Sequence, residues 1–368
     1  MVIRNGQELG LYFHFPYCSQ RCPYCDFTLT VGEIPHNQYL QAAINETSLR
    51  IEDLSHYGWT PRPLTSLYFG GGTPGLWSTK SLGKYIDNCA DRFGLNDQIE
   101  VTIEANPAEV SLALLHEWRS IGVNRLSLGA QSMRSIALQR LGRDHTPEQV
   151  RRVVDWARFV GIERVNVDLI HGLSGETERE ALFDLEALLQ VSPSHISLYQ
   201  LTIEPQTSFG ARARRGEILI EPEEELLRIY RVLEARLAEA RMPLYEVSNA
   251  ALSGEESRHN LLYWTMGEYL GIGAGAHARV YLPHQEGRSL RALRWQNTRS
   301  IKSYLERSLI GDPLSTLEEE RGFLDDEALA EESVLVGLRL TEGLRLTADI
   351  AARYSSHAQS LIKEGLLL

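Results

Sequence analysis

The chain has 368 residues, of which 43% are hydrophobic and 23% are charged, and it carries a formal net charge of −12 at pH 7. This composition is typical of a globular protein and excludes a disordered or fibrous chain. Because the acidic balance repels phosphate backbones, we expect no nucleic-acid partner. No apolar run reaches the length of a membrane span, and the first ten residues lack the apolar core of a secretion signal. Both features predict a cytoplasmic location.

Six short apolar runs alternate with segments in which apolar residues recur every three or four positions. This alternation predicts parallel strands joined by helices on right-handed crossovers. Six such units favour an α/β fold with an incomplete TIM-like (β/α)6 barrel, although a doubly wound open sheet fits the pattern nearly as well. The predicted strands are 11–15, 65–69, 99–104, 124–128, 164–169 and 194–199, and the predicted helices between them are 36–55, 78–92, 110–120, 147–160 and 177–190.

Residues suited to helix starts precede or begin most of these helical segments. Asn37, Ser111, Thr146 with Pro147, and Thr177 are where we expect caps or first-turn prolines. Beyond residue 205 the alternation stops. We therefore predict a core barrel over 1–205, an α+β extension over 206–299, and a small helical or winged-helix-like module over 300–368. The helices expected there are 221–241, 301–309, 326–338 and 347–353.

Polar residues end or follow each of the six predicted strands. Because the carboxyl ends of parallel strands meet at one rim, residues far apart in the chain are expected to converge there. Strand ends are usually polar, but that tendency explains one or two such residues more easily than six. The rim candidates are a cysteine loop, Gly70–Pro74, Glu104, Gln131, Asp168 and Tyr199 with Gln200.

The cysteine loop contains Cys18, Cys22 and Cys25 in a Cys-x3-Cys-x2-Cys spacing. Such crowding in a chain with few cysteines indicates a metal or redox site. Three thiolates suit an iron–sulfur cubane that keeps one iron open to an outside ligand, because protein-ligated cubanes usually have four cysteines.

The three thiols are also compatible with a zinc site or with disulfide pairing. A zinc ion could recruit His14, Asp26 or His36 as its fourth ligand. Disulfide pairing fits less well, because three thiols are an odd set and we expect a reducing compartment. Cys89 stands apart in a helical segment, where we expect a small buried residue with no role.

The segments YFHFPYCSQRCPYCDF and YFGGGTP resemble the radical S-adenosylmethionine (SAM) superfamily. The resemblance implies a 4Fe-4S cluster held by Cys18, Cys22 and Cys25, SAM on the open iron, and an electron donor as partner. In that superfamily an injected electron cleaves the sulfonium of SAM and releases methionine and a 5′-deoxyadenosyl radical. The chemistry would belong to the cofactor, and the protein would position it and exclude water.

The same resemblance implies SAM contacts along the rim. Gly71, Gly72 and Thr73 match the triglycine loop that binds the methionine amino group of SAM, and Glu104 matches a further SAM contact. Glycines there let the backbone approach a ligand without a side-chain clash. Taken alone, the same loop would be explained by a tight turn from strand to helix.

Further SAM contacts are implied later along the chain. Gln131 and Arg143 resemble contacts to the ribose and carboxylate of SAM, although Arg143 could equally be a surface arginine. Asp168 lies in an apolar strand, where an unpaired carboxylate is costly, so ribose hydroxyls or an arginine should pair with it. Tyr12 and Tyr24 flank the cluster loop and would pack against adenine or belong to the core.

Four later segments narrow the resemblance to one branch of the superfamily, which contains oxygen-independent coproporphyrinogen III oxidase and its haem-chaperone relatives. The oxidase has a fourth cysteine two positions after the third, where this chain has Phe27, and a long N-terminal arm, whereas 17 residues precede Cys18 here. Both differences favour the haem-chaperone group, HemW. The four segments are HISLYQLTIEPQTSF (195–209), YEVSNAA (245–251), RHNLLYW (258–264) and LGIGAGAHA (270–278).

That group implies a protein that binds haem and passes it to acceptor proteins, which include membrane-associated ones. His259, Tyr263 and Trp264 belong to its HNxxYW motif, in which the histidine could ligate iron and the aromatics form an apolar wall. One histidine beside aromatics is more often a hydrogen-bonded core group, and His277 is a second candidate ligand. The alternative functions are oxidation of coproporphyrinogen III, methylation of haem by a radical SAM enzyme, and a structural zinc protein.

Overall fold

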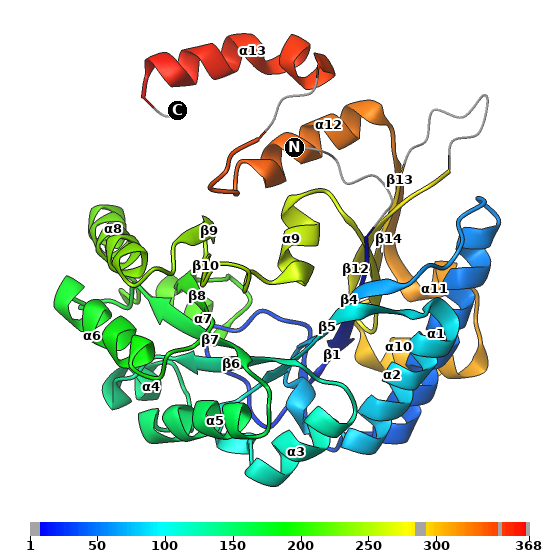
Figure 1. Ribbon diagram of the computed structural model, residues 1–368, viewed down its shortest axis with the longest axis horizontal. Coiled ribbons are helices and arrows are strands. Elements are labelled where there is room, and N and C mark those ends of the chain that lie inside the picture. The colour runs from blue at the N-terminus through cyan, green and yellow to red at the C-terminus, as the bar shows by residue number, and fades with distance from the viewer. Residues whose placement is uncertain (1–7, 284–291, 345–347, 366–368) are drawn as a thin grey trace.

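The computed structural model of the protein describes residues 8–283, 292–344 and 348–365 (Figure 1). Its main strands are β1 (Leu9–Phe15), β4 (Leu64–Gly71), β5 (Leu95–Ala105), β6 (Arg125–Gln131), β7 (Arg164–His171), β8 (His195–Gln200), β9 (Leu244–Glu246), β10 (Asn249–Ala251), β11 (Glu268–Ile272), β12 (His277–Tyr281), β13 (Ala292–Asn297) and β14 (Glu318–Leu324). They form one sheet in the order β14-β13-β12-β11-β1-β4-β5-β6-β7-β8-β10-β9. Two short strands, β2 (Tyr17–Cys18) and β3 (Thr30–Val31), pair with each other.

The order of the parallel strands identifies the architecture. From β1 through β4, β5, β6 and β7 to β8, each strand pairs in parallel with the next one in this series. A doubly wound sheet reverses direction at a switch point, so that alternative is wrong. The sheet curves around an interior, but its outermost strands, β9 and β14, are not paired with each other among the described residues. The predicted incomplete barrel is therefore confirmed.

The connecting helices cover the outer face of this curved sheet (Figure 1). The six predicted strands and five predicted helices of the core match observed elements to within a few residues. The helices are α1 (His36–Ser55), α2 (Thr79–Phe93), α3 (Leu112–Ser120), α4 (Ser135–Arg140), α5 (Pro147–Phe159), α6 (Glu178–Leu189), α7 (Ser208–Arg214), α8 (Glu223–Glu239), α9 (Arg258–Trp264), α10 (Ile301–Ile310), α11 (Leu314–Leu317), α12 (Asp326–Gly337) and α13 (Ala348–Lys363).

Three of the four predicted helix starts are confirmed. The side chain of Ser111 caps α3, and Thr146 and Thr177 form reciprocal capping boxes at α5 and α6. The prediction for Asn37 is wrong, because α1 begins one residue earlier and Pro35 occupies its cap position without a side-chain hydrogen bond.

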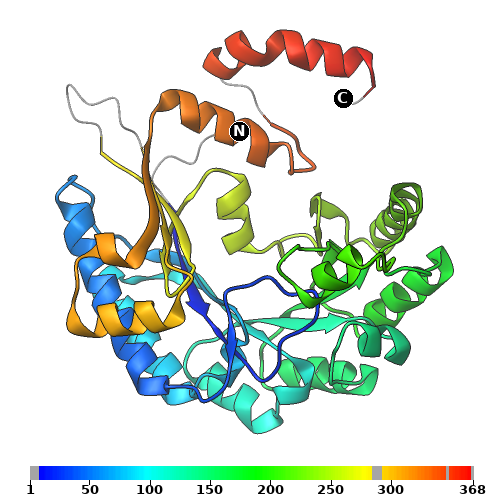
Figure 2. The same ribbon diagram turned by 180° about the vertical axis from the view of Figure 1, so that it is seen from behind.

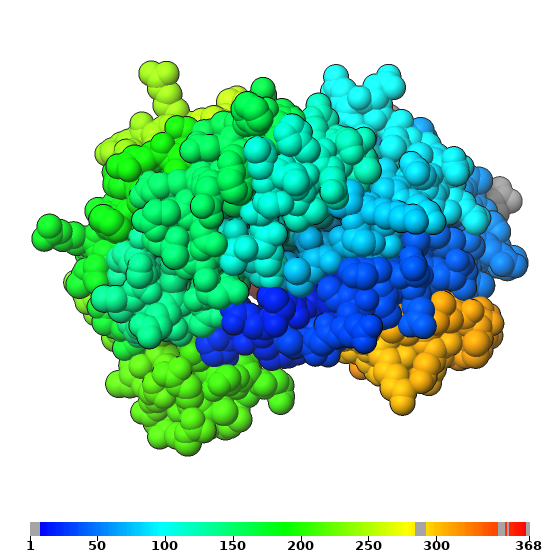
Figure 3. All heavy atoms as spheres, turned by 90° about the horizontal axis from the view of Figure 1, so that it is seen from below, coloured from blue at the N-terminus to red at the C-terminus, as the bar shows by residue number. Residues whose placement is uncertain are grey.

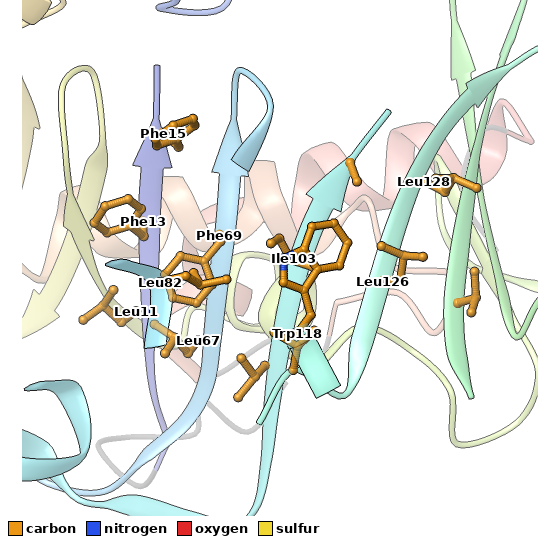
Figure 4. Packing of buried hydrophobic residues seen from close by; sticks show 14 of the residues in the cluster. Leu11, Phe13, Phe15, Leu67, Phe69, Leu82, Ile103, Trp118, Leu126 and Leu128 are labelled. Carbon is orange, nitrogen blue, oxygen red and sulfur yellow. The ribbon is translucent and has the colours of Figure 1, made fainter. Parts of the chain in front are cut away.

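Side chains alternate between the two faces of each barrel strand. Leu11, Phe13 and Phe15 of β1 point toward the helices and form the core with their neighbours on β4 (Figure 4). The Phe13 ring stacks on Trp77, with ring centroids 4.8 Å apart. Because the side-chain period of a strand is two, the residues between them face the barrel interior. Tyr12 and His14 of β1 belong to this inner row. The predicted burial of Cys89 is also confirmed, since it belongs to the outer core.

The region after residue 205 extends the barrel sheet at both edges. Strand β11 pairs in parallel with β1, and β10 pairs antiparallel with β8. Sequence periodicity missed β11, because this strand is short, lacks the apolar alternation of the earlier strands and runs into the glycine-rich segment 271–277. The predicted domain limits of 1–205, 206–299 and 300–368 therefore stay a prediction, and one sheet runs through all three.

The C-terminal part contains the helices expected there. The predicted helices 221–241, 301–309 and 326–338 correspond to α8, α10 and α12. The predicted helix 347–353 is the start of the longer α13, and its first residue lies outside the described ranges. In Figure 2, α13 lies beyond α12, away from the barrel. Among the described residues, no helix combines the length and apolar character needed to cross a membrane.

Candidate cofactor and ligand sites

The cysteine loop, residues 18–25, follows β1 at the carboxyl rim of the barrel. It is held on one side by α7, where the Phe209 N–H donates to the Pro23 carbonyl at 2.8 Å and the Phe209 ring lies 6.4 Å from that of Tyr24. On the other side, Arg299 donates to a backbone carbonyl just after the loop at 2.7 Å. Figure 3 shows this blue segment between the green and orange surfaces of those two regions.

Thr73 and Arg143 donate hydrogen bonds to the cysteine sulfurs. Thr73 Oγ1 lies 3.3 Å from Cys18 Sγ, and Arg143 Nη1 lies 3.2 Å from Cys22 Sγ. Asn106 joins the two donors, because its amide donates to Thr73 Oγ1 at 3.2 Å and its carbonyl accepts from Arg143. Arg143 is thus a partly buried partner of the loop and not a surface arginine. Donors aimed at thiolate sulfur are the usual surroundings of a metal centre.

The raised pKa values of two cysteine thiols in the loop are consistent with a site for a positively charged metal centre. All four cysteines are free thiols. Burial raises the pKa of the Cys18 thiol to about 11, and the nearby thiolates of Cys22 and Cys25 add to that shift. Burial also raises the pKa of Cys25. A bound metal centre would offset the cost of gathering three thiolates here.

The donor set fits an iron–sulfur cluster better than zinc. Zinc needs its ligands about 2.3 Å from a single point. Within the described ranges, no three His, Cys, Asp or Glu side chains surround such a point. Each proposed fourth ligand also has another partner: His14 Nε2 lies 2.8 Å from the Thr28 carbonyl, His36 Nδ1 accepts from a backbone N–H, and the Asp26 carboxylate lies 3.7 Å from Arg299. A cubane binds each thiolate at a separate iron, so its cysteines need not surround a single point.

Glu104 holds the triglycine loop at the end of β4. Its carboxylate accepts from the Gly71 N–H at 3.0 Å and from the Tyr68 hydroxyl at 2.8 Å. Burial raises its pKa to about 7, with the Asp168 carboxylate adding to the shift. Gly71 has a φ of 113°, and a Cβ there would lie 2.7 Å from the His14 ring. Close packing against β1 therefore requires glycine here, whether or not a ligand approaches.

Gln131 combines backbone strain with an unsatisfied buried atom. It ends β6 with a φ of 66°, in the left-handed region that non-glycine residues rarely adopt. Its Oε1 is buried without a hydrogen-bond partner. Its amide nitrogen and the guanidinium of Arg143 both lie against Gly129. A bound polar ligand at the rim would satisfy the free acceptor and explain why the strain is kept.

Asp168 is paired by a residue that sequence reasoning missed. Asn166 Nδ2 donates to its carboxylate at 2.8 Å, so neither an arginine nor ribose is needed as the first partner. Asp168 also lies within β7 and not at its end. Burial raises its pKa to about 6. Asn166 Oδ1 in turn accepts from His195 Nδ1 at 2.7 Å, which leaves His195 Nε2 to accept from the Tyr245 hydroxyl at 3.0 Å.

His259 is a hydrogen-bonded core group in this structure. Its side chain is 1% exposed, Nδ1 lies 2.8 Å from Ser66 Oγ, and Nε2 lies 2.8 Å from the Tyr263 hydroxyl. Burial lowers its pKa to about 3, so the ring is neutral. The buried carboxylate of Glu100 accepts from its backbone N–H at 3.2 Å and anchors the start of α9. Both ring nitrogens are therefore occupied, as the core interpretation of the motif expects.

Register places His259 away from the cysteine loop. Its partner Ser66 pairs with Gly10 near the start of β1, whereas His14 pairs with Gly70 near the rim. Tyr12 lies between these levels, with its ring centroid 6.2 Å from that of His259. Tyr12 and Tyr24 thus have different surroundings: Tyr12 stacks in the interior, and Tyr24 packs on α7 beside the loop.

A cavity of about 560 Å³ opens between the end of the cysteine loop, α9, β11, β12 and α12. Its volume is within the range of small-molecule sites. Aromatic rings dominate its walls, and the Nε1 of Trp264 is buried there without a partner. The lining residues are Tyr12, His14, Asp26, Phe27, Thr28, Tyr263, Trp264, Tyr269, Gly275, His277, Arg279, Gln296, Arg299, Glu332 and Val336.

The cysteine loop and the polar residues Gly71, Glu104 and Gln131 lie together at the carboxyl rim of an incomplete barrel, an arrangement typical of radical SAM proteins. The family model "Radical SAM superfamily" matches residues 12–188. The chain is 38% identical over 302 residues to "Heme chaperone HemW" of Escherichia coli, covering 81% of this chain and 77% of that protein. It is 34% identical over 366 residues to "Heme chaperone HemW" of Mycobacterium tuberculosis, covering 98% of this chain and 89% of that protein.

The chain therefore belongs to the HemW family within the radical SAM superfamily. Membership of the superfamily implies a 4Fe-4S cluster and SAM. The solved structure of coproporphyrinogen III oxidase (HemN) from Escherichia coli has a TM-score of 0.77 with this chain, at 21% identity, and the match covers 97% of this chain and 82% of that one. This similarity shows that the two proteins share a fold.

Several residues of the site were not identified from the sequence. Tyr68 and Asn166 position the two carboxylates, and Asn106 joins the donors to the cysteine sulfurs. The sequence could have pointed to all three. Tyr68 and Asn166 lie two residues before the candidates Gly70 and Asp168 on the same strands, and Asn106 lies two residues after Glu104. Arg279 and Arg299 of the cavity carried no such signal, since neither belongs to a motif.

Proposed function

We propose that the protein is a haem chaperone, which binds haem as cargo in the cavity beside the cysteine loop and passes it to acceptor proteins. The cavity itself carries this proposal. Its aromatic walls, two arginines and exposed histidine match a flat apolar macrocycle with two carboxylates and an iron that takes axial ligands. Membership of the HemW family supports the same conclusion.

In this proposal Cys18, Cys22 and Cys25 hold a 4Fe-4S cluster whose fourth iron takes SAM. Such a cluster would supply one-electron chemistry at SAM, with an external electron donor as partner. Thr73 and Arg143 hold the cysteine sulfurs by hydrogen bonds. These donors neutralise part of the thiolate charge and fix the loop.

SAM would lie across the inner rim, where Gln131 offers a free buried acceptor. Gly71, Gly72, Glu104, Arg143 and Asp168 would complete its surroundings. Asn166 holds the Asp168 carboxylate in place, and Tyr68 does the same for Glu104. Because neutral carboxyl groups donate hydrogen bonds, the pKa of Glu104, raised to about 7, allows this acid to donate as well as accept near pH 7. Asp168, with a pKa raised to about 6, is mostly ionised at that pH and accepts hydrogen bonds.

Tyr263 and Trp264 would form the apolar wall of the haem site, with Tyr12 at its inner end. The Trp264 ring is held from behind by Arg339, whose guanidinium carbon lies 4.4 Å from the ring centroid. A wall fixed in this way keeps its shape without cargo. We expect the protein to act in the cytoplasm, where its four free thiols stay reduced, and to meet membrane-associated acceptors there.

Anaerobic reconstitution with iron and sulfide, followed by titration with haemin, tests this proposal. We expect about four iron atoms per chain, and a stoichiometric Soret band with haemin. Cys22→Ala should lose the cluster, whereas Cys89→Ala, which changes a buried thiol outside the loop, should keep it.

Coproporphyrinogen III incubated with SAM and reductant tests the oxidase alternative in the same preparation, and methylated tetrapyrrole would indicate a methyltransferase. A preparation that binds no haem, or that yields vinyl product, contradicts the chaperone function. Zinc in place of iron would contradict the cluster.

A further inference from the structure

Three histidines lie in or next to the proposed haem site, and their ring nitrogens differ in what they contact. His14 lines the cavity, but its Nδ1 lies 3.0 Å from the Tyr12 hydroxyl and its Nε2 lies 2.8 Å from the Thr28 carbonyl. His259 is buried behind the cavity wall, with Ser66 and Tyr263 on its two nitrogens. Neither ring has a nitrogen available for iron unless a hydrogen bond is broken.

His277 has the opposite surroundings. It begins β12, lines the cavity and is exposed to solvent. Its imidazole makes no hydrogen bond within the described ranges. The strand holds its backbone, because His277 pairs with Gln296 of β13, another residue of the cavity wall. An exposed, unpaired imidazole on a rigid strand is the arrangement that an axial iron ligand requires.

Two arginines line the same cavity, and only one has donors to spare. Arg279 is 3% exposed, pairs with Glu332 at 2.8 Å and donates to several backbone carbonyls. Arg299 is half-exposed at the cavity wall, and its Nε donates to Thr28 at 3.1 Å. Its Nη2 donates to the Asp26 carbonyl at 2.7 Å and lies 3.7 Å from the Asp26 carboxylate, whereas Nη1 has no partner among the described residues. A guanidinium with free donors is suited to a carboxylate.

From this juxtaposition we propose that His277, and not His259 of the HNxxYW motif, ligates the haem iron, and that Arg299 pairs with a haem propionate. The inference rests on the proposed function. The macrocycle would then lie between the ring of Phe27, 61% exposed on the cysteine-loop side, and the aromatic wall of α9. Haem and cluster would thus be neighbours, separated by the segment that follows Cys25.

The iron ligand is tested on the full-length chain with haemin, using the spin state and Soret position as readouts. His277→Ala should lose the histidine-ligated signature and bind haemin about tenfold more weakly, and added imidazole should restore the spectrum. His259→Gln is the matched variant, because glutamine can donate to and accept from the two partners of His259. It should keep the histidine signature.

The propionate contact is tested by comparing haemin with its dimethyl ester. Arg299→Gln should weaken haemin binding about tenfold and leave the ester unaffected, because the ester lacks the carboxylate. Arg294→Gln is the control: that side chain is 49% exposed against 50% for Arg299, but it pairs with Glu332 and does not line the cavity. It should change neither affinity.

The outcomes separate the two proposals. If the unaltered protein binds no haemin, the proposed function fails. If it binds haemin and His277→Ala keeps the full histidine signature while His259→Gln loses it, the assignment of His277 is overturned and the chaperone function stands. Circular dichroism and thermal unfolding establish that each variant is folded, and His277→Cys, which should change the signature to that of a thiolate, gives a second reading of the same ligand.

Discussion

The structure predicts that Gly71→Ala destabilises the protein through two separable effects. The backbone of Gly71 has a φ of 113°, and an added Cβ would meet the His14 ring at 2.7 Å. That ring cannot move freely, because hydrogen bonds to Tyr12 and Thr28 hold both its nitrogens. Both the backbone and the contact therefore oppose any side chain at this position.

Two other glycines allow the backbone strain and the steric contact to be measured separately. Gly122 has a φ of 98° with nothing within 4 Å of an added Cβ, so Gly122→Ala measures backbone strain alone, about 1–2 kcal/mol. At Gly72 the Cβ would lie 2.6 Å from the Tyr17 carbonyl oxygen without positive φ, so Gly72→Ala measures overpacking, about 1–3 kcal/mol. The sum gives about 2–5 kcal/mol for Gly71→Ala.

Urea unfolding of the three variants and the unaltered chain measures these differences. We expect Gly71→Ala to have the larger loss of unfolding free energy, above that of Gly122→Ala by the overpacking contribution. Equal losses in the two variants would refute the claim that contact with His14 requires the glycine. The triglycine sequence would then be explained by ligand approach alone, and SAM affinity would fall without a loss of stability.

Three further predictions concern buried polar groups of the interior. The pKa of Glu104 is raised to about 7 in the folded protein, so the unfolding free energy should fall by about 3 kcal/mol as pH rises from about 4.5 through 7. Glu104→Gln should lack this pH dependence when unfolding is compared at about pH 5 and about pH 8. The same pH dependence in the variant would contradict the assignment to Glu104. Asn166→Ala removes the 2.8 Å hydrogen bond to the Asp168 carboxylate, so unfolding free energy should fall by about 1–3 kcal/mol and SAM affinity should fall with it, whereas unchanged SAM affinity would contradict the positioning role. Glu100→Gln breaks a buried ion pair with Arg164 at 3.0 Å, so the unfolding free energy should fall by about 3–5 kcal/mol. A fall below about 1 kcal/mol would show that the pair does not anchor α9.

Local patterns in the sequence were sufficient for the barrel and for the cysteine loop. Periods of two and near four are properties of single elements, so strands and helices of the core could be placed without tertiary information. The candidates Glu104, Gln131 and Asp168 were found because each interrupts or ends an apolar run. Prediction failed for an element whose structure depends on a distant strand. Strand β11 has no apolar alternation, and its place in the sheet comes from pairing with β1.

The sequence by itself determined which chemical groups are available: three clustered thiols, carboxylates in or at the ends of predicted strands and an aromatic motif near residue 260. Only the tertiary structure decided which of these groups are free to act. His259 belongs to a recognisable motif but has both nitrogens occupied in the core, while His277, less prominent in the sequence, lies unpaired in the cavity. The reason is physical: whether a donor atom is available depends on burial and on hydrogen-bond partners from distant strands, and a linear pattern contains neither.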